Sequence, residues 1–94
     1  MSKVFKALAD PTRRKVLQLL REEELSAGEL AEHFDFSKPT LSRHFSVLKE
    51  ADLIQSNKRG NHIFYRLNIS VLEEAMWAMM NMFGVNPRDE NEEE

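Results

Sequence analysis

The chain contains no cysteine. This absence excludes a disulfide framework, a thiolate metal site, a cysteine nucleophile and a thiol redox switch. No apolar run reaches the roughly 18 residues that a membrane span needs, and no basic segment followed by an apolar one begins the chain. We therefore expect a cytoplasmic protein, and a length of 94 residues allows one domain.

The acidic excess of the chain is concentrated at one end. The formal net charge is −3, but residues 37–66 carry six basic and two acidic residues, a net charge of +4. Residues 67–94 carry one basic and seven acidic residues, and five of these acids lie in the last six positions. This asymmetry is typical of a nucleic-acid-binding surface beside an acidic tail. We predict one domain over residues 1–86 and a disordered acidic tail over residues 87–94.

Polar capping residues mark the starts of the predicted helices. Asp10 precedes a proline, which is the pattern of an N-cap and a first helical position, and a short amphipathic segment comes before it. Ser26 opens a Ser-x-x-Glu capping box, which predicts a helix over residues 26–34. Another serine begins a helix over residues 37–51. Two helices joined by so short a connection favour a helix-turn-helix.

The hydrophobic period changes after this helix. Residues 53–55 and 62–67 are typical of two strands, and residues 57–61 supply the turn between them. A last helix is expected to start at Asn68 or at the Ser70 capping box and to end near Phe83, where Gly84 suits the C-cap. The predicted fold is mostly α with a small β-hairpin, in the order α-α-α-α-β-β-α: a winged helix-turn-helix.

The helix over residues 37–51 carries the strongest functional signal. Its apolar residues share one face, while short polar and basic side chains occupy the other, as reading base edges in the major groove requires. The hairpin turn adds two cations that suit phosphate or minor-groove contact. The predicted DNA-binding residues are Ser37, Lys38, Thr40, Ser42, Arg43, Lys58, Arg59 and Gly60. The competing interpretation of such a face is simple solvation. For the basic run at residues 13–15, solvation or pairing with acids is the first interpretation and phosphate contact the second.

The last helix is apolar nearly all round and must be covered on more than one side. We predict a homodimer, because so small a domain cannot cover this helix alone. The predicted interface consists of Val4, Phe5, Leu8, Leu72, Ala75, Met76, Met79, Met80 and Phe83. The alternative is a winged-helix interaction module whose Met-rich helix forms a groove for another protein. A membrane-surface helix is disfavoured because its polar face lacks Lys and Arg.

Residue types that would carry catalysis or bind metal are scattered. The three histidines are isolated and have no partner at metal-ligand spacing, and no nucleophile motif or glycine-rich phosphate loop occurs. We expect no enzyme activity, no metal site and no cofactor. The predicted partners are double-stranded operator DNA and a second copy of the chain.

Four stretches together resemble the ArsR/SmtB-type bacterial winged-helix repressors: residues 5–17, 25–31, 37–45 and 59–67. The resemblance covers about residues 3–83 and is greatest to the metal-independent autorepressor branch. It implies a homodimer that blocks transcription from a palindromic operator, with the first and last helices forming the interface. By motif position it also implies base contacts at Lys38, Thr40, Ser42 and Arg43, and wing contacts at Lys58, Arg59 and Gly60.

The chain departs from the metal-sensing members of this family. Ser26, Gly28 and Ala31 stand where those members place cysteines, and apolar residues with Glu73 and Glu74 stand where others place Asp and His ligands. Both sensor sites are therefore expected to be empty. A small molecule, a protein partner or no inducer at all remain as alternatives for the releasing signal.

Overall fold

The predicted winged helix-turn-helix is confirmed by a computed structural model, which describes residues 2–85. The predicted acidic tail, residues 87–94, lies outside the described residues. The elements in chain order are α1 (Ser2–Leu8), α2 (Pro11–Glu22), β1 (Leu25–Ser26), α3 (Ala27–Ala31), α4 (Lys38–Glu50), β2 (Ile54–Arg59), β3 (His62–Leu67) and α5 (Ile69–Met82).

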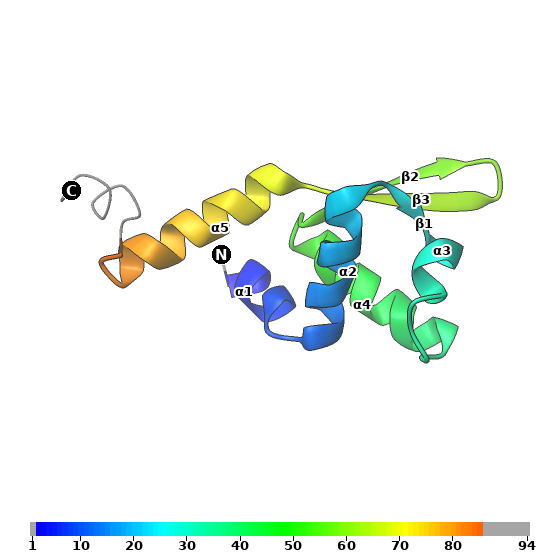
Figure 1. Ribbon diagram of the computed structural model, residues 1–94, viewed down its shortest axis with the longest axis horizontal. Helices are drawn as coiled ribbons and strands as arrows, with labels where there is room; N and C mark the ends of the chain where they lie inside the picture. The colour runs from blue at the N-terminus through cyan, green and yellow to red at the C-terminus, as the bar shows by residue number, and fades with distance from the viewer. Residues whose placement is uncertain (1, 86–94) are drawn as a thin grey trace.

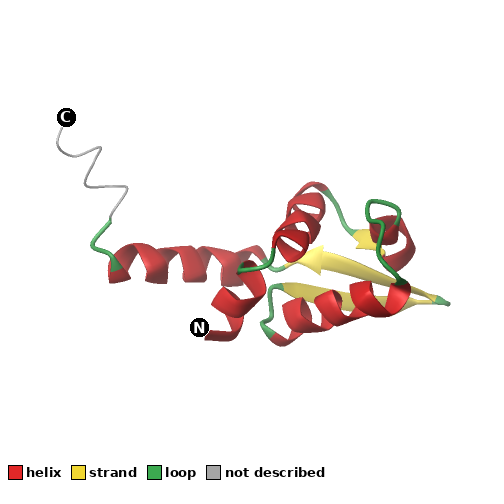
Figure 2. Ribbon diagram, turned by 90° about the horizontal axis from the view of Figure 1, so that it is seen from below, coloured by secondary structure: helices red, strands yellow, loops and turns green. Residues whose placement is uncertain are grey.

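The elements form a helical body from which two parts project in opposite directions (Figure 1). The strands make one antiparallel sheet in the order β1-β3-β2, and helices α2, α3 and α4 lie around it (Figure 2). The β2–β3 hairpin extends past α3 at one end, and α5 extends past α1 at the other. The molecule is consequently elongated, with extents of 52 × 22 × 21 Å.

The core lies where the sheet meets the helices. Leu30, Leu48 and Leu53 are completely buried there. The ring of Tyr65 in β3 packs 5.0 Å from that of Phe45 in α4, between centroids, and burial raises the pKa of the tyrosine. This contact joins the sheet directly to the second helix of the helix-turn-helix.

The structure confirms most of the predicted helix ends. The Asp10 side chain accepts a hydrogen bond from the Arg13 backbone N–H, and the capping box at Ser26 is formed in both directions. Helix α3 ends at Ala31, earlier than predicted. After it the backbone continues in two turns of the 3₁₀ type, in which the N–H groups of His33 and Phe34 donate to the carbonyls three residues before them. These turns lead into α4.

Of the two predicted starts of α5, the structure confirms Asn68, which holds the N-cap position without a side-chain hydrogen bond. The alternative, a capping box at Ser70, is wrong, because Ser70 lies inside the helix. At the other end Gly84 adopts a φ of 70°, and the N–H groups of Gly84 and Val85 bond back to Asn81 and Met80. This is the Schellman pattern that the glycine predicts.

Two features of the sheet differ from the sequence prediction. Strand β1 was not predicted; its two residues pair with Tyr65 and Phe64 of β3. The hairpin turn is also shorter than predicted, since β2 continues to Arg59 and leaves only Gly60 and Asn61 in the loop. Gly60 has a φ of 62°, which two-residue hairpin loops require at a central position.

Within residues 2–85, no helix has the length and apolar character needed to cross a membrane.

The Asp10 cap gives a prediction about stability and its pH dependence. Partial burial opposes ionisation of this carboxyl, but the backbone N–H donors of Arg13 and Thr12 and the positive charge of Arg13 outweigh it and lower the pKa of Asp10. We expect Asp10→Ala to lower the free energy of unfolding by about 1 kcal/mol at pH 7. A group with a lowered folded-state pKa stabilises above its unfolded pKa of about 3.9 and loses that effect as pH falls through the folded value.

Denaturant unfolding at a fixed protein concentration checks this expectation. The difference between wild type and Asp10→Ala should shrink below about pH 4. Asp10→Asn is the control, because asparagine caps a helix as well as aspartate but carries no charge. A difference that is the same at pH 3 and pH 7 would show that the charge contributes nothing.

Candidate nucleic-acid interface

Helices α3 and α4 form the helix-turn-helix, and α4 divides into two faces. Leu41, Phe45 and Leu48 are buried on one face. Lys38, Ser42 and Arg43, three of the predicted DNA-binding residues, are exposed, and we call these three residues the reading face. The apolar stripe therefore fixes which side chains of α4 face solvent.

Ser37 and Thr40, also predicted to bind DNA, bond to each other. The Ser37 hydroxyl accepts from the Thr40 backbone N–H at 3.3 Å and donates to the Thr40 hydroxyl oxygen at 2.9 Å. The pair thus holds the first turn of α4 in place. Thr40 keeps its own hydroxyl hydrogen for donation.

The electrostatic character of α4 suits a polyanion. Residues 37–49 contain no acidic residue, and the N-terminus of the helix adds its own partial positive charge. Among residues 2–85 the structure shows no intramolecular hydrogen bond or ion pair to the side chains of Lys38 or Arg43. Both cations are available to phosphate or base edges.

The structure separates the two predicted cations of the wing. Lys58 and Arg59 both lie in β2 rather than in the turn, and consecutive strand residues point to opposite faces of the sheet. Arg59 forms an ion pair with Glu24 and lies over the Phe64 ring, 4.4 Å from its centroid. Lys58 pairs across the hairpin with the exposed Ile63, and the part of the chain that the structure describes gives its ammonium no partner.

Glu24 pairs with a predicted DNA-binding residue, and the sequence did not indicate this contact. It ends a run of three glutamates whose composition is typical of a solvated loop. Its partner Arg59 is 35 residues away, and only the pairing of β1 with β3 brings the two together. No local pattern indicates such a contact.

The side chains of the basic run at residues 13–15 were predicted to be solvated or paired with acids. Arg14 and Lys15 are exposed, and within residues 2–85 all three side chains bond to backbone carbonyls and none to an acid. Arg13 donates to the carbonyls of Lys6 and Ala7, and Arg14 donates to that of Leu8. Lys15 donates to the His33 carbonyl. The first two side chains thus bind carbonyls at the C-terminal end of α1, where cations are favourable.

The sequence model of the family described as "Bacterial regulatory protein, arsR family" matches residues 10–56, which contain the whole helix-turn-helix. The chain belongs to the ArsR family.

Relatives and solved structures of the ArsR family extend this match over nearly the whole chain. The chain is 44% identical to the transcriptional repressor SdpR of Bacillus subtilis (strain 168), over 95% of this chain and 99% of that protein. It is 39% identical to an arsenical resistance operon repressor of Staphylococcus xylosus, over 96% and 84% of the two chains. Its fold matches an ArsR-like transcriptional regulator from Rhodococcus sp. RHA1 with a TM-score of 0.81 and 29% identity, over 88% and 76% of the chains. This ArsR-family protein is a DNA-binding transcriptional repressor, and not an enzyme.

The divided wing gives a prediction about DNA affinity. Lys58→Ala should weaken binding to all duplexes alike and reduce the slope of log affinity against log salt by about one for each bound protomer, because each protomer loses one phosphate contact. Arg59→Ala should change that slope less, since the cation is already paired with Glu24. Fluorescence anisotropy titrations over a range of salt concentrations measure both slopes.

The two variants remove the same charge from neighbouring positions, so each is the control for the other. Equal slopes for Lys58→Ala and Arg59→Ala would show that the ion pair with Glu24 opens on DNA.

Proposed function

We propose that this repressor acts as a homodimer on a palindromic operator, without a metal-sensing site and with its own promoter among its targets. We assign this function to residues 1–86 as a single domain. The dimer proposal is supported by the apolar surface of α5, most of which the rest of the described chain does not cover.

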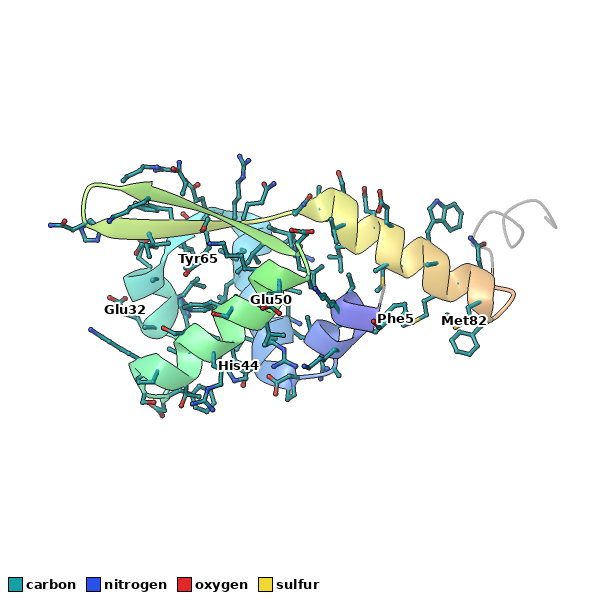
Figure 3. All side chains as sticks on the ribbon, turned by 180° about the vertical axis from the view of Figure 1, so that it is seen from behind. Phe5, Glu32, His44, Glu50, Tyr65 and Met82 are labelled. Carbon is teal, nitrogen blue, oxygen red and sulfur yellow. The ribbon has the colours of Figure 1, made fainter. Side chains whose placement is uncertain are left out.

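Most of α5 lies away from the core. Of its residues only Ala75 is buried, where the helix packs against α1. Met82 and Phe83 are 65% and 72% exposed, and in Figure 3 Met82 lies at the end of α5 far from the hairpin. Exposed apolar surface of this extent on a small soluble domain marks an interaction site.

The predicted interface residues fall into three groups by exposure. Val4 and Ala75 are buried within the chain itself and have little surface left for a second copy. Phe5, Leu8, Leu72 and Met80 are half-buried. Met76, Met79 and Phe83 are exposed. Trp77 and Met82 were not predicted to lie in the interface, but they are also exposed. The apolar surface available to a second protomer is therefore broader than the predicted one.

A two-fold dimer explains how so short a reading face selects a site. Two copies joined through α5 and α1 carry two α4 helices, which can enter successive major grooves about 34 Å apart. Two-fold symmetry of the protein then requires a palindromic operator.

Metal independence rests on the residues at the two sensor positions. Within residues 2–85, no three or more His, Asp or Glu side chains come together as a metal site requires. Ser26 caps α3 and Gly28 and Ala31 lie within it, so these positions offer no strong metal ligand. Autoregulation is proposed because the sequence resembles the autorepressor branch of the family.

The dimer proposal predicts the effect of a charge on α5. Met79→Glu should turn the dimer into a monomer, since an unpaired carboxylate buried at an interface costs about 3 kcal/mol or more. Asn81→Glu is the matched control, because it adds the same charge at an exposed polar position of the same helix. Light scattering at micromolar concentration measures the mass of each variant.

A wild-type monomer without affinity for its promoter DNA would instead favour the alternative function, a module that binds another protein through α5. Dimers of equal mass for Met79→Glu and wild type would contradict the assigned interface.

The reading face predicts where sequence specificity lies. Selection from random duplexes by the wild-type protein defines the operator, and the same site should occur upstream of the gene. Arg43→Ala should then lose about 1–3 kcal/mol of discrimination between this operator and a scrambled duplex, because arginine reads guanine with two hydrogen bonds.

Lys49→Ala removes the same charge from the last turn of α4 and is the control. It should weaken binding to the operator and to the scrambled duplex equally. Unchanged discrimination in Arg43→Ala would overturn the assignment of the reading face.

A further inference from the structure

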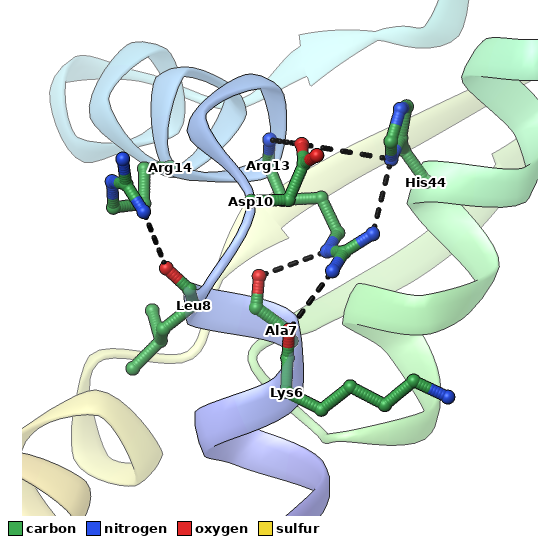
Figure 4. A network of polar contacts seen from close by, with 7 residues as sticks. All are labelled: Lys6, Ala7, Leu8, Asp10, Arg13, Arg14 and His44. Atoms are coloured by element: carbon green, nitrogen blue, oxygen red, sulfur yellow. Dashed lines mark hydrogen bonds and ion pairs between the residues drawn. The ribbon is translucent and has the colours of Figure 1, made fainter.

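The side chain of Arg13 joins three elements at a point between α1 and α4 (Figure 4). Its Nε donates to the Ala7 carbonyl at 2.8 Å, and one terminal nitrogen donates to the Lys6 carbonyl at 2.9 Å. The other terminal nitrogen lies 3.2 Å from Nδ1 of His44 in α4. One guanidinium on α2 thus contacts the end of α1 and the middle of α4.

The direction of the contact with His44 follows from its chemistry. A guanidinium only donates hydrogen bonds, so Nδ1 of His44 is the acceptor and carries no proton. The imidazole is mostly enclosed, with its side chain 19% exposed, and the ring of Phe36 lies 6.3 Å from it between centroids. Asp10, whose carboxylate lies 3.9 Å from the same nitrogen, also accepts from the Arg13 backbone N–H.

This contact constrains α4 in a way that its apolar stripe does not. Leu41, Phe45 and Leu48 hold the helix against the core through non-directional contacts, which tolerate small rotations about the helix axis. A hydrogen bond is directional. His44 directly follows Arg43 on the helix, so fixing the position of His44 fixes the direction in which Arg43 leaves the helix.

We propose that Arg13 is a positioning residue that sets the rotation of α4, the helix that carries the reading face, relative to α1, and so couples the proposed dimer interface to base reading. This inference rests on the proposed function. Bidentate contact with a base tolerates misplacement of only about 0.5 Å or 10–20°. Loss of the Arg13–His44 contact therefore lowers specificity more than it lowers general DNA affinity.

Arg14 provides a matched control within the chain. It also donates to a carbonyl at the end of α1, that of Leu8, at 2.9 Å. Unlike Arg13, it makes no hydrogen bond to α4 among the contacts of residues 2–85. Lysine at either position keeps the charge, but its single ammonium cannot reproduce the planar fork that reaches three acceptors.

The test compares Arg13→Lys with Arg14→Lys in the full chain. The readout is the ratio of affinities for the duplex selected by wild type and for its scrambled version, with thermal unfolding measured alongside. Arg13→Lys should lower this ratio about tenfold, a usual size for coupling between sites. Arg14→Lys should change it less than about twofold. Equal ratios for the two variants, with or without equal losses of stability, would overturn the proposal.

Two substitutions at His44 test the contact from the other side and remain informative if Arg13→Lys does not fold. His44→Asn keeps an acceptor near the position of Nδ1 and should retain the wild-type ratio. His44→Leu removes the acceptor and should match Arg13→Lys, and the double variant Arg13→Lys/His44→Leu should show no further loss. Additive losses in the double variant, or equal ratios for His44→Asn and His44→Leu, would contradict the coupling.

The experiment also separates this inference from the proposed function. A wild-type protein that selects no duplex overturns both. A wild-type protein that selects a duplex, and loses specificity with Arg43→Ala but not with Arg13→Lys, overturns the positioning role alone.

Discussion

Burial of one stripe of α4 is the constraint on which the remaining structure depends. Leu41, Phe45 and Leu48 must leave water, and they do so against the core formed by α1, α2 and the sheet. The same burial turns Lys38, Ser42 and Arg43 outward on a helix with no acidic residue before its last turn. Packing of the core and exposure of a cationic surface are thus two results of one periodicity.

The sequence predicted those parts of the fold that local chemistry determines. Caps at Asp10, Ser26 and Ser37, and the glycine after α5, each act within a few residues and appear where predicted. Strand β1 was missed because its two residues gain their strand character only by pairing with β3, about 40 positions later in the chain. Short elements of this kind have no periodicity of their own.

The candidate site was predictable to a similar degree. The face of α4 follows from the spacing of its apolar residues, and the structure exposes Lys38, Ser42 and Arg43 together. The contacts of Arg13 and Arg59 did not follow, since each is made with a partner distant in sequence: His44 for Arg13 and Glu24 for Arg59. Charge counts along the chain cannot distinguish a cation held by the fold from one available to DNA.

The elongated shape has a mechanical consequence for a two-fold assembly. The wing and the exposed end of α5 lie at opposite ends of a body 52 Å long. In a dimer joined through the α5 ends, the wing of each protomer lies at the end of the protomer that is farthest from the interface. A small change in the angle between the protomers at the interface therefore displaces the wings over a large distance. A ligand or partner that slightly alters the α5 contact can thus move both wings out of register with the DNA grooves.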